Sequence, residues 1–186
     1  MSTPRKYLHV LTVDNPEDAI KLKWVAKKVK NPYSTDIILL MQRMKEIAQN
    51  PNVAGIAATQ LGRPFRLFAL HIDKTKPVKF YFNPKITAES EDTSTQMEGC
   101  LSVPGKHGLV TRAKSVALKY QDQNGNTKTE VFHANDLTDG FAARAVQHEM
   151  DHLNKILYID KCEEILTDEP KTLDEIVSGM DNKVTT

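Results

Sequence analysis

The chain has 186 residues and a mass of 20.9 kDa, with 40% hydrophobic and 26% charged residues, a composition typical of one globular domain. Lys and Arg number 25 against 24 Asp and Glu, so the net charge gives no general attraction to nucleic acid or to an anionic membrane. No apolar run approaches the roughly 20 residues that span a bilayer, and two cysteines cannot form a disulfide framework. We expect a single domain over residues 1–186, with neither nucleic-acid binding nor membrane association.

The first quarter of the chain predicts helical structure. Apolar residues recur at helical spacing over 22–29, between lysines, which allows a short helix there, although the family resemblance described below implies a loop-like segment. A clearer amphipathic helix begins after Ser34 or Thr35, because either side chain can cap it and Asp36 follows in the first turn. Its apolar stripe is formed by Ile37, Leu40, Met41, Met44, Ile47 and Ala48.

Short strands and turns are predicted after Pro51. The expected strands cover 65–72, 78–82, 109–110, 115–120 and 127–132. The pair Asn83-Pro84 is expected to end the second strand, and Asn124-Gly125 marks a hairpin between the last two.

Helical periodicity returns at Leu137 or Thr138 and continues to Leu153. The predicted fold class is therefore α+β: antiparallel strands packed around a late metal-binding helix, with an early amphipathic helix. Residues after about 162 are polar and hold few apolar anchors, so we expect a loosely attached tail there.

The late helix carries the strongest chemical motif, His148-Glu149-Met150-Asp151-His152. Residues four apart share a helix face, so both imidazoles can bind one metal ion, and Glu149 can reach a water on that metal. Because catalytic sites of this kind normally have three protein ligands, a third one has to come from elsewhere in the chain.

Known metallopeptidase patterns do not supply that third ligand. Lys155 and Tyr158 stand where a metzincin has Gly and His, which excludes that class. A gluzincin needs a Glu on a following helix, and Pro170 together with weak periodicity makes the C-terminal residues a poor scaffold for one.

Either cysteine is a candidate. Cys162 follows the apolar segment 156–159, which favours a packed thiol. Cys100 follows Gly99 among small and polar residues, which suit a loop that presents a thiolate. The residues alone leave the choice open, and Cys100 taken alone is more typical of a buried cysteine.

A third segment, Gly55-Ile56-Ala57-Ala58-Thr59-Gln60, is rich in small residues that permit close backbone approach. The amide of Gln60 can donate to an oxyanion. Taken alone, the segment indicates a tight packing turn.

The three motifs together, in this order and with this spacing, resemble the peptide deformylase family over about Leu22 to Asp160. Further matching features are Asn83-Pro84, Arg112, the Asp122–Gly125 turn and Leu157-Tyr158-Ile159-Asp160. The resemblance implies removal of the N-formyl group from nascent chains that begin with formyl-methionine, by a monomer that meets them at the ribosome. It implies a location in the bacterial cytoplasm, or in a host cytosol if the gene is carried by a phage.

The resemblance also implies roles for individual residues. The metal ligands would be Cys100, His148 and His152, with Glu149 as the catalytic acid/base. Gln60 and the backbone N–H of Leu101 would bind the oxyanion, and Gly55 would bind the substrate backbone as an added strand. Family members use Fe²⁺, with Zn²⁺, Ni²⁺ or Co²⁺ as substitutes, and two imidazoles with one thiolate do not by themselves select iron.

Two positions depart from the family pattern. Val53 stands where the family has Gly, which stiffens the rim of the expected site. Lys155 stands where the family has Gly after the metal helix, and we expect Asn154 to take the left-handed cap conformation instead. Both changes bear on substrate preference, since neither touches a ligand.

The methionine side chain is expected in an apolar pocket near the metal helix. Candidates to line it are Phe141, the ring face of His148 and Val103. Arg144 lies one turn before His148, where it either borders that pocket or, as we favour, is solvated or salt-bridged. Glu98 and Arg112 are candidates for an ion pair that holds the cysteine loop, with a surface role as the alternative for Arg112.

Two other functions remain as alternatives. One is a metallopeptidase of another class, with an unrecognised third ligand. The other is a structural zinc protein, in which Cys162 closes the site as a fourth ligand and Glu149 has no role.

Overall fold

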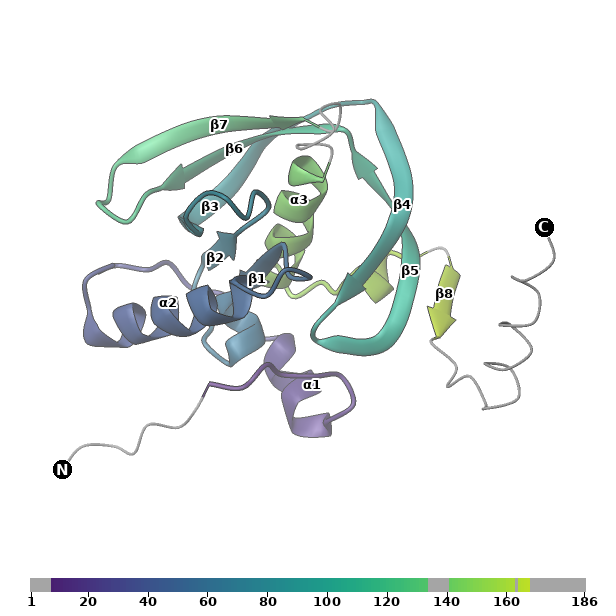
Figure 1. Ribbon diagram of the computed structural model, residues 1–186, viewed down its shortest axis with the longest axis horizontal. Helices are drawn as coiled ribbons and strands as arrows, with labels where there is room; N and C mark the ends of the chain where they lie inside the picture. The colour runs from purple at the N-terminus through teal and green to yellow at the C-terminus, as the bar shows by residue number, and fades with distance from the viewer. Residues whose placement is uncertain (1–7, 134–140, 163, 168–186) are drawn as a thin grey trace.

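The computed structural model describes residues 8–133, 141–162 and 164–167. These residues form an α+β fold in which helix α3 lies against two antiparallel sheets (Figure 1), as predicted. One sheet has the strand order β1-β2-β3-β6-β7 and the other β4-β5-β8. The helices are α1 (Pro16–Leu22), α2 (Thr35–Ala48) and α3 (Ala142–Leu153). The strands are β1 (Gly55–Ala57), β2 (Leu67–Leu70), β3 (Lys79–Glu89), β4 (Thr93–Cys100), β5 (Val103–Ala113), β6 (Ser115–Gln121), β7 (Thr127–His133) and β8 (Glu164–Thr167).

The first helix lies earlier than predicted. Helix α1 ends at Leu22, so the short helix that the spacing allowed over 22–29 is wrong. The side chain of Asn15 accepts hydrogen bonds at the N-terminus of α1, and Pro16 occupies the first turn, where its missing N–H costs nothing. The lysine-rich segment instead runs beside the sheet, where the backbone of Lys27 forms an isolated parallel β-bridge with the backbone of Phe65.

Helix α2 confirms the second helical prediction. Ser34 is its N-cap residue, and Ile37, Leu40, Met44 and Ala48 are buried. These residues pack in one apolar cluster with β1 and β2, so the Met-rich stripe belongs to the core.

Strand β3 continues through Asn83-Pro84, so the strand end predicted there is wrong. Asn83 has a φ of 50°, and the pairing of β3 with β6 shifts register between Phe82 and Lys85. The Asn83 side chain also binds the backbone of Val29 through both its oxygen and its nitrogen. The pair therefore forms a bulge whose cost is offset by a tertiary contact.

Two hairpins complete the sheets. The β6–β7 hairpin turns at Asn124-Gly125, as predicted, with Gly125 at a φ of 82°. The β4–β5 hairpin turns directly after Cys100, which is the last residue of β4. Cys100 is therefore presented by a strand end and not by the loop that we expected.

Both ends of α3 bear on the predictions. The expected start at Leu137 or Thr138 lies outside the described residues. At the other end Asn154 has a φ of −105° and Lys155 a φ of 66°, so Lys155, and not Asn154, takes the left-handed conformation. Beyond the helix, β8 pairs with β5, so the loosely attached tail expected after 162 is wrong for residues 164–167; residues 168–186 lie outside the described part.

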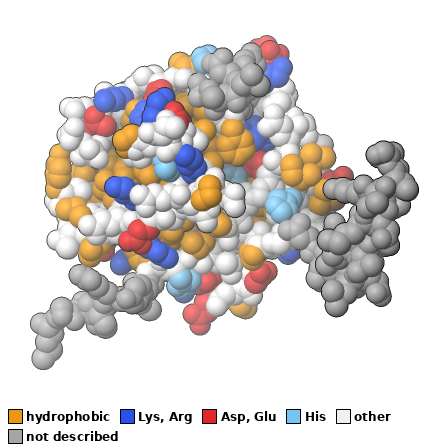
Figure 2. Space-filling view, in the orientation of Figure 1, with side chains coloured by type: hydrophobic (Ala, Val, Ile, Leu, Met, Phe, Trp, Pro, Cys, Tyr) orange, Lys and Arg blue, Asp and Glu red, His pale blue; other side chains and the backbone are white. Residues whose placement is uncertain are grey.

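The core surrounds α3, whose residues are almost all buried. Its apolar side chains share one cluster with those of β2, β3, β6 and β7. On the face that Figure 2 shows, acidic and basic side chains are interspersed. Within the described ranges, no helix has the length and apolar character needed to cross a membrane.

Candidate metal centre

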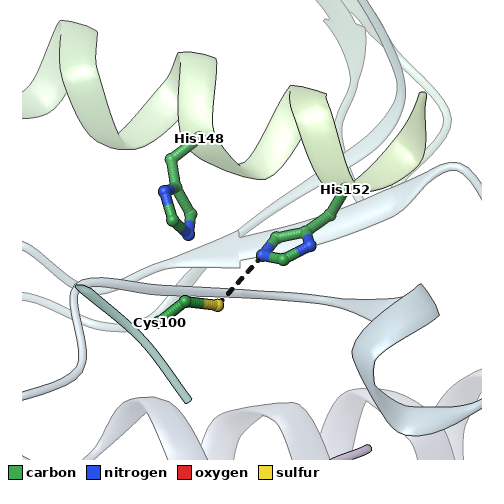
Figure 3. A group of neighbouring side chains, drawn as sticks. All are labelled: Cys100, His148 and His152. Carbon is green, nitrogen blue, oxygen red and sulfur yellow. Dashed lines mark hydrogen bonds between the residues drawn. The ribbon is translucent and has the colours of Figure 1, made fainter. Parts of the chain in front are cut away.

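Three predicted metal ligands come together between β4 and α3. The ligand atoms of Cys100, His148 and His152 all lie within 4.8 Å of one another, and Figure 3 shows the three side chains pointing into one space. The Nε2 of His152 lies 3.3 Å from the sulfur of Cys100, and the two imidazole rings are 5.0 Å apart. One thiolate and two imidazoles are donors that suit zinc, iron and similar divalent ions.

The sulfur of Cys100 accepts two hydrogen bonds from N–H groups. The side-chain amide of Gln60 donates to Sγ over 3.3 Å, and the backbone N–H of Ser102 donates over 3.4 Å. N–H donors stabilise the negative sulfur, which is the form that binds a metal.

The ion pair predicted between Glu98 and Arg112 is present and buried. Arg112 donates through Nε over 2.6 Å and through Nη2 over 2.8 Å, one bond to each carboxylate oxygen. Burial acts to raise the pKa of Glu98, but the hydrogen bonds from Arg112 and His148 outweigh it and hold that pKa well below its usual value. Glu98 is therefore a carboxylate at neutral pH.

This carboxylate orients the first imidazole. Nδ1 of His148 lies 2.9 Å from Glu98 Oε2. Because an ionised carboxylate only accepts hydrogen bonds, Nδ1 is the donor, and Nε2 is the nitrogen through which His148 can bind a metal once that nitrogen is deprotonated.

The pKa values of the two imidazoles are shifted in opposite directions. Burial lowers the pKa of His148, but its hydrogen bonds with Cys100 and Glu98 prevail and raise that pKa to about 10. Burial and the charge on His148 together lower the pKa of His152 well below its usual value. Without a metal His148 is therefore protonated at neutral pH and His152 is neutral, so metal binding displaces a proton from His148.

Glu149 is buried beside the ligands, and its Oε2 has no hydrogen-bond partner among the described residues. Its carboxylate packs directly against Gly55, where a Cβ atom would lie 2.5 Å from Oε1. Burial raises the pKa of Glu149 to about 7, although positive charge on His148 and Arg112 opposes the shift. A carboxyl group with this pKa can both take and release a proton near neutral pH.

A cleft of about 480 Å³ opens onto the site, a volume within the range of small-ligand sites. Its lining includes the predicted residues Val53, Gly55, Gln60, Leu101 and Phe141, together with Cys100, His148 and Glu149. Val103 is only 1% exposed and packs with Val110 and Leu157, so its predicted place in the substrate pocket is wrong. Its inward position on β5 turns it to the core.

The two expected oxyanion donors differ in the hydrogen bonds that they make in this structure. Gln60 donates to the Cys100 sulfur and to the Ser102 hydroxyl, while its Oε1 accepts from the backbone of Ala57. The backbone N–H of Leu101 has no acceptor within the part of the chain that the structure describes. Both residues line the cleft.

Several cleft residues were not predicted. Asn52, Met97 and His107 also line it, and Met97 is 44% exposed. Placing Met97 and His107 requires the pairing of β4 with β5, whereas Asn52 lies in the turn before β1, and the residue types of all three give no signal for the cleft. Arg144 forms a buried salt bridge with Glu98 and also lines the cleft, so it is both salt-bridged and at the border of the pocket, and it is not solvated.

A half-buried thiol, two imidazoles and a buried, unpaired carboxyl group beside an open cleft are typical of metal-dependent hydrolases. The sequence model of the polypeptide deformylase family matches residues 7–167. The chain therefore belongs to the peptide deformylase family, and it is an enzyme that removes the N-formyl group from nascent chains.

Individual relatives agree with this assignment. The peptide deformylase of Caulobacter vibrioides is 36% identical over 154 residues, which cover 81% of this chain and 85% of that protein. A peptide deformylase from Synechococcus elongatus, solved with actinonin, superposes with a TM-score of 0.73 at 28% identity, over 98% of this chain and 90% of that one. A class I type b peptide deformylase from Acinetobacter baumannii, solved with Met-Ala-Ser, gives 0.70 at 32% identity, over 83% and 97%.

Family membership removes both alternative functions. Cys162 is outside the three-residue ligand group, and its thiol donates to the carbonyl of Glu164 over 2.9 Å. A fourth ligand from Cys162 is therefore not part of this site as it stands.

Proposed function

We propose that Cys100, His148 and His152 bind one divalent metal ion, and that formyl-methionyl peptides are hydrolysed in the adjoining cleft. The observation that carries the proposal is the convergence of these three ligand atoms beside the buried, unpaired carboxyl group of Glu149. A closed structural site has no use for such a group, whereas hydrolysis requires a proton acceptor next to the metal.

The metal we propose is Fe²⁺, with Zn²⁺, Ni²⁺ and Co²⁺ as substitutes. The donor set accepts all four ions, and the resemblance to the family favours iron. A divalent ion held by these ligands supplies a Lewis acid that lowers the pKa of water at its open position.

The protein groups then manage protons and charge. Glu149 accepts a proton from the attacking water and later delivers it to the nitrogen of the leaving amine. The backbone N–H of Leu101 and the side-chain amide of Gln60 donate to the formyl oxygen as negative charge develops on it.

The cleft also suits an extended peptide. Strand β1 is the last strand on its side of the five-stranded sheet, so its outer edge can pair with a substrate backbone at Gly55. Phe141, Met97 and Leu101 are between 43% and 46% exposed and give the methionine side chain an apolar surface. His148 contributes a ring to the same lining.

We further propose that the substrates are nascent chains emerging from the ribosome, and that the enzyme acts as a monomer in the cytoplasm of a bacterium, or of a bacterial host if a phage encodes it. Supporting this are the bacterial relatives and the small apolar cleft, which fits one peptide terminus.

The test is formate release from formyl-Met-Ala-Ser by protein purified without oxygen, with metal analysis of the same sample. We expect one metal ion per chain, and one formate released for each free amine that is produced. Cleavage of unformylated peptides at internal bonds, or a metal that stays bound after Cys100→Ser, would reject the proposal.

A further inference from the structure

Arg144 is a buried arginine in the wall of the cleft, one helical turn before His148. It is 3% exposed. Its Nη1 donates to Glu98 Oε1 over 2.6 Å and to the carbonyl of Val110 over 2.9 Å, and its Nη2 donates to the carbonyl of Ser94 over 2.7 Å. The charged end is therefore committed to β4 and β5 and is not available to bind substrate.

With the hydrogen bond from Arg144, every acceptor position of the Glu98 carboxylate has a donor. Arg112 donates to both oxygens of Glu98, Arg144 adds a second bond to Oε1, and His148 Nδ1 adds a second bond to Oε2. A carboxylate has about four lone-pair positions. Since all of them are used, Glu98 has a single hydrogen-bonded orientation.

Arg112 alone does not balance the charge of this carboxylate. Its Nη1 also donates to Asp151 over 2.6 Å, so one guanidinium is shared by two carboxylates. Arg144 supplies the second buried positive charge. Asp151 has a second partner in Lys161, whose Nζ donates to Oδ1 over 2.7 Å, so Asp151 does not depend on Arg144. Removing Arg144 takes from Glu98 one hydrogen bond and one buried positive charge beside the metal ligands.

We propose that Arg144 is a positioning residue of the metal centre: its guanidinium completes the hydrogen bonds of Glu98, and the carboxylate fixed in this way holds His148 with Nε2 toward Cys100 and His152. The inference rests on the proposed function, because that proposal makes His148 a metal ligand. The competing explanation is a purely structural role, in which Arg144 only joins α3 to β4 and β5.

The test compares Arg144→Met with Gln147→Met in the zinc-loaded enzyme. Methionine retains an unbranched apolar stem in the cleft wall but donates no hydrogen bond. Gln147 is a matched control, because it is 8% exposed on the same helix and its amide joins α3 to the backbone of Ala113 without a bond to Glu98. The measurements are the zinc dissociation constant by chelator competition, the NMR resonance of the His148 Nδ1–H, the melting temperature, and kcat and KM for formyl-Met-Ala-Ser.

We expect Arg144→Met to raise the zinc dissociation constant about tenfold or more, since lost outer partners of a metal ligand typically cost 10- to 100-fold in affinity. The His148 Nδ1–H resonance should shift or broaden, and kcat should fall while KM changes by less than about twofold. Gln147→Met should lower the melting temperature and leave the zinc affinity and the resonance unchanged. Arg144→Lys, which keeps the charge but not the fork of donors, should give an intermediate zinc affinity.

The proposal is overturned if Arg144→Met loses stability as Gln147→Met does but binds zinc with wild-type affinity and keeps the wild-type resonance. If Arg144→Met does not fold, Arg144→Lys decides the matter, and wild-type zinc affinity in that variant overturns the proposal. A wild-type enzyme that releases no formate would reject the deformylase reaction, whereas weakened zinc binding in the Arg144 variants would still support the positioning role.

Discussion

Replacing Gly55 by Ala tests the close packing of β1 against the catalytic carboxyl group. A Cβ atom at this position would lie 2.5 Å from Glu149 Oε1 and 2.9 Å from its Cγ and Cδ, against 3.4 Å at the lower end of ordinary van der Waals contact. Gly55 is not among the glycines with positive φ, so the backbone accepts alanine and the whole effect comes from this contact.

The size of the effect follows from two opposing terms. Overpacking a rigid interior costs about 1–3 kcal/mol, and the alanine recovers about 0.4–1 kcal/mol by restricting the unfolded chain. The net loss of about 1–2 kcal/mol should lower the melting temperature by about 2–8 °C for a chain of this length. Because Glu149 has to move, we expect turnover of formyl-Met-Ala-Ser to fall about 100-fold, with little loss of bound metal.

The assay is a double-mutant cycle with Glu149→Asp, which shortens the side chain by one methylene and withdraws it from Gly55. In that background Gly55→Ala should cost less than about 0.5 kcal/mol of stability. An equal cost of Gly55→Ala in both backgrounds, or an alanine variant with full turnover, would refute the reasoning that the glycine makes room for the carboxyl group.

The remaining predictions concern the ligands, the proton carrier and the helix end. His152→Ala should lose its metal and its activity together, measured by elemental analysis and formate release, and stoichiometric metal in this variant would remove His152 from the ligand set. Glu149→Gln should keep its metal and lose about 10²–10⁴ in turnover, because Glu149 handles protons and does not bind the ion; loss of metal in this variant would make the carboxylate a ligand. Lys155→Gly should raise the melting temperature by about 2–4 °C at unchanged activity. A φ of 66° costs a non-glycine residue about 1–3 kcal/mol in the folded protein, and glycine removes this cost. The greater conformational freedom of glycine in the unfolded chain cancels only part of the stabilisation. An unchanged or lower melting temperature in calorimetry would show that Lys155 is not strained.

The candidate ligands could be found from the sequence where the geometry is local or the motif is specific, and the structure brings the three of them together. The pairing of His148 with His152 follows from the pitch of a helix, and the sequence around them predicts that helix. Cys100 lies on a hairpin that is distant in sequence from His148 and His152. Its motif, and not its spacing from these histidines, therefore indicated it as a candidate ligand. The ion pair between Glu98 and Arg112 was a candidate from the sequence, but the register of β4 with β5 does not explain it, because Arg112 stands opposite Ser94 and Glu98 opposite Gly108.

The failures share one cause, which is that tertiary contacts override local preference. Asn83-Pro84 interrupts a strand in an isolated peptide, but contacts with Val29 hold Asn83 in a bulge and β3 continues. Lys155 takes a conformation that usually belongs to glycine, because the chain must turn after α3 to bury Leu157 and Tyr158. Such positions depend on what the rest of the fold requires of the backbone.

The sequence also could not predict that the charged side chain of Arg144 is buried. Arg144 stands among apolar helix residues, and its depth is explained only by the acceptors that β4 and β5 present to it. A sequence does not indicate which carboxylate a given arginine will meet.

The most direct test of the central claim is formate released from formyl-Met-Ala-Ser by the metal-loaded enzyme, with Glu149→Gln loaded with the same metal as the control. The account predicts one formate for each free methionyl amine produced by the wild-type chain, and release at least about 100-fold slower by the variant. Equal formate release by both proteins, or amine produced without formate, would contradict a deformylase whose Glu149 transfers the proton.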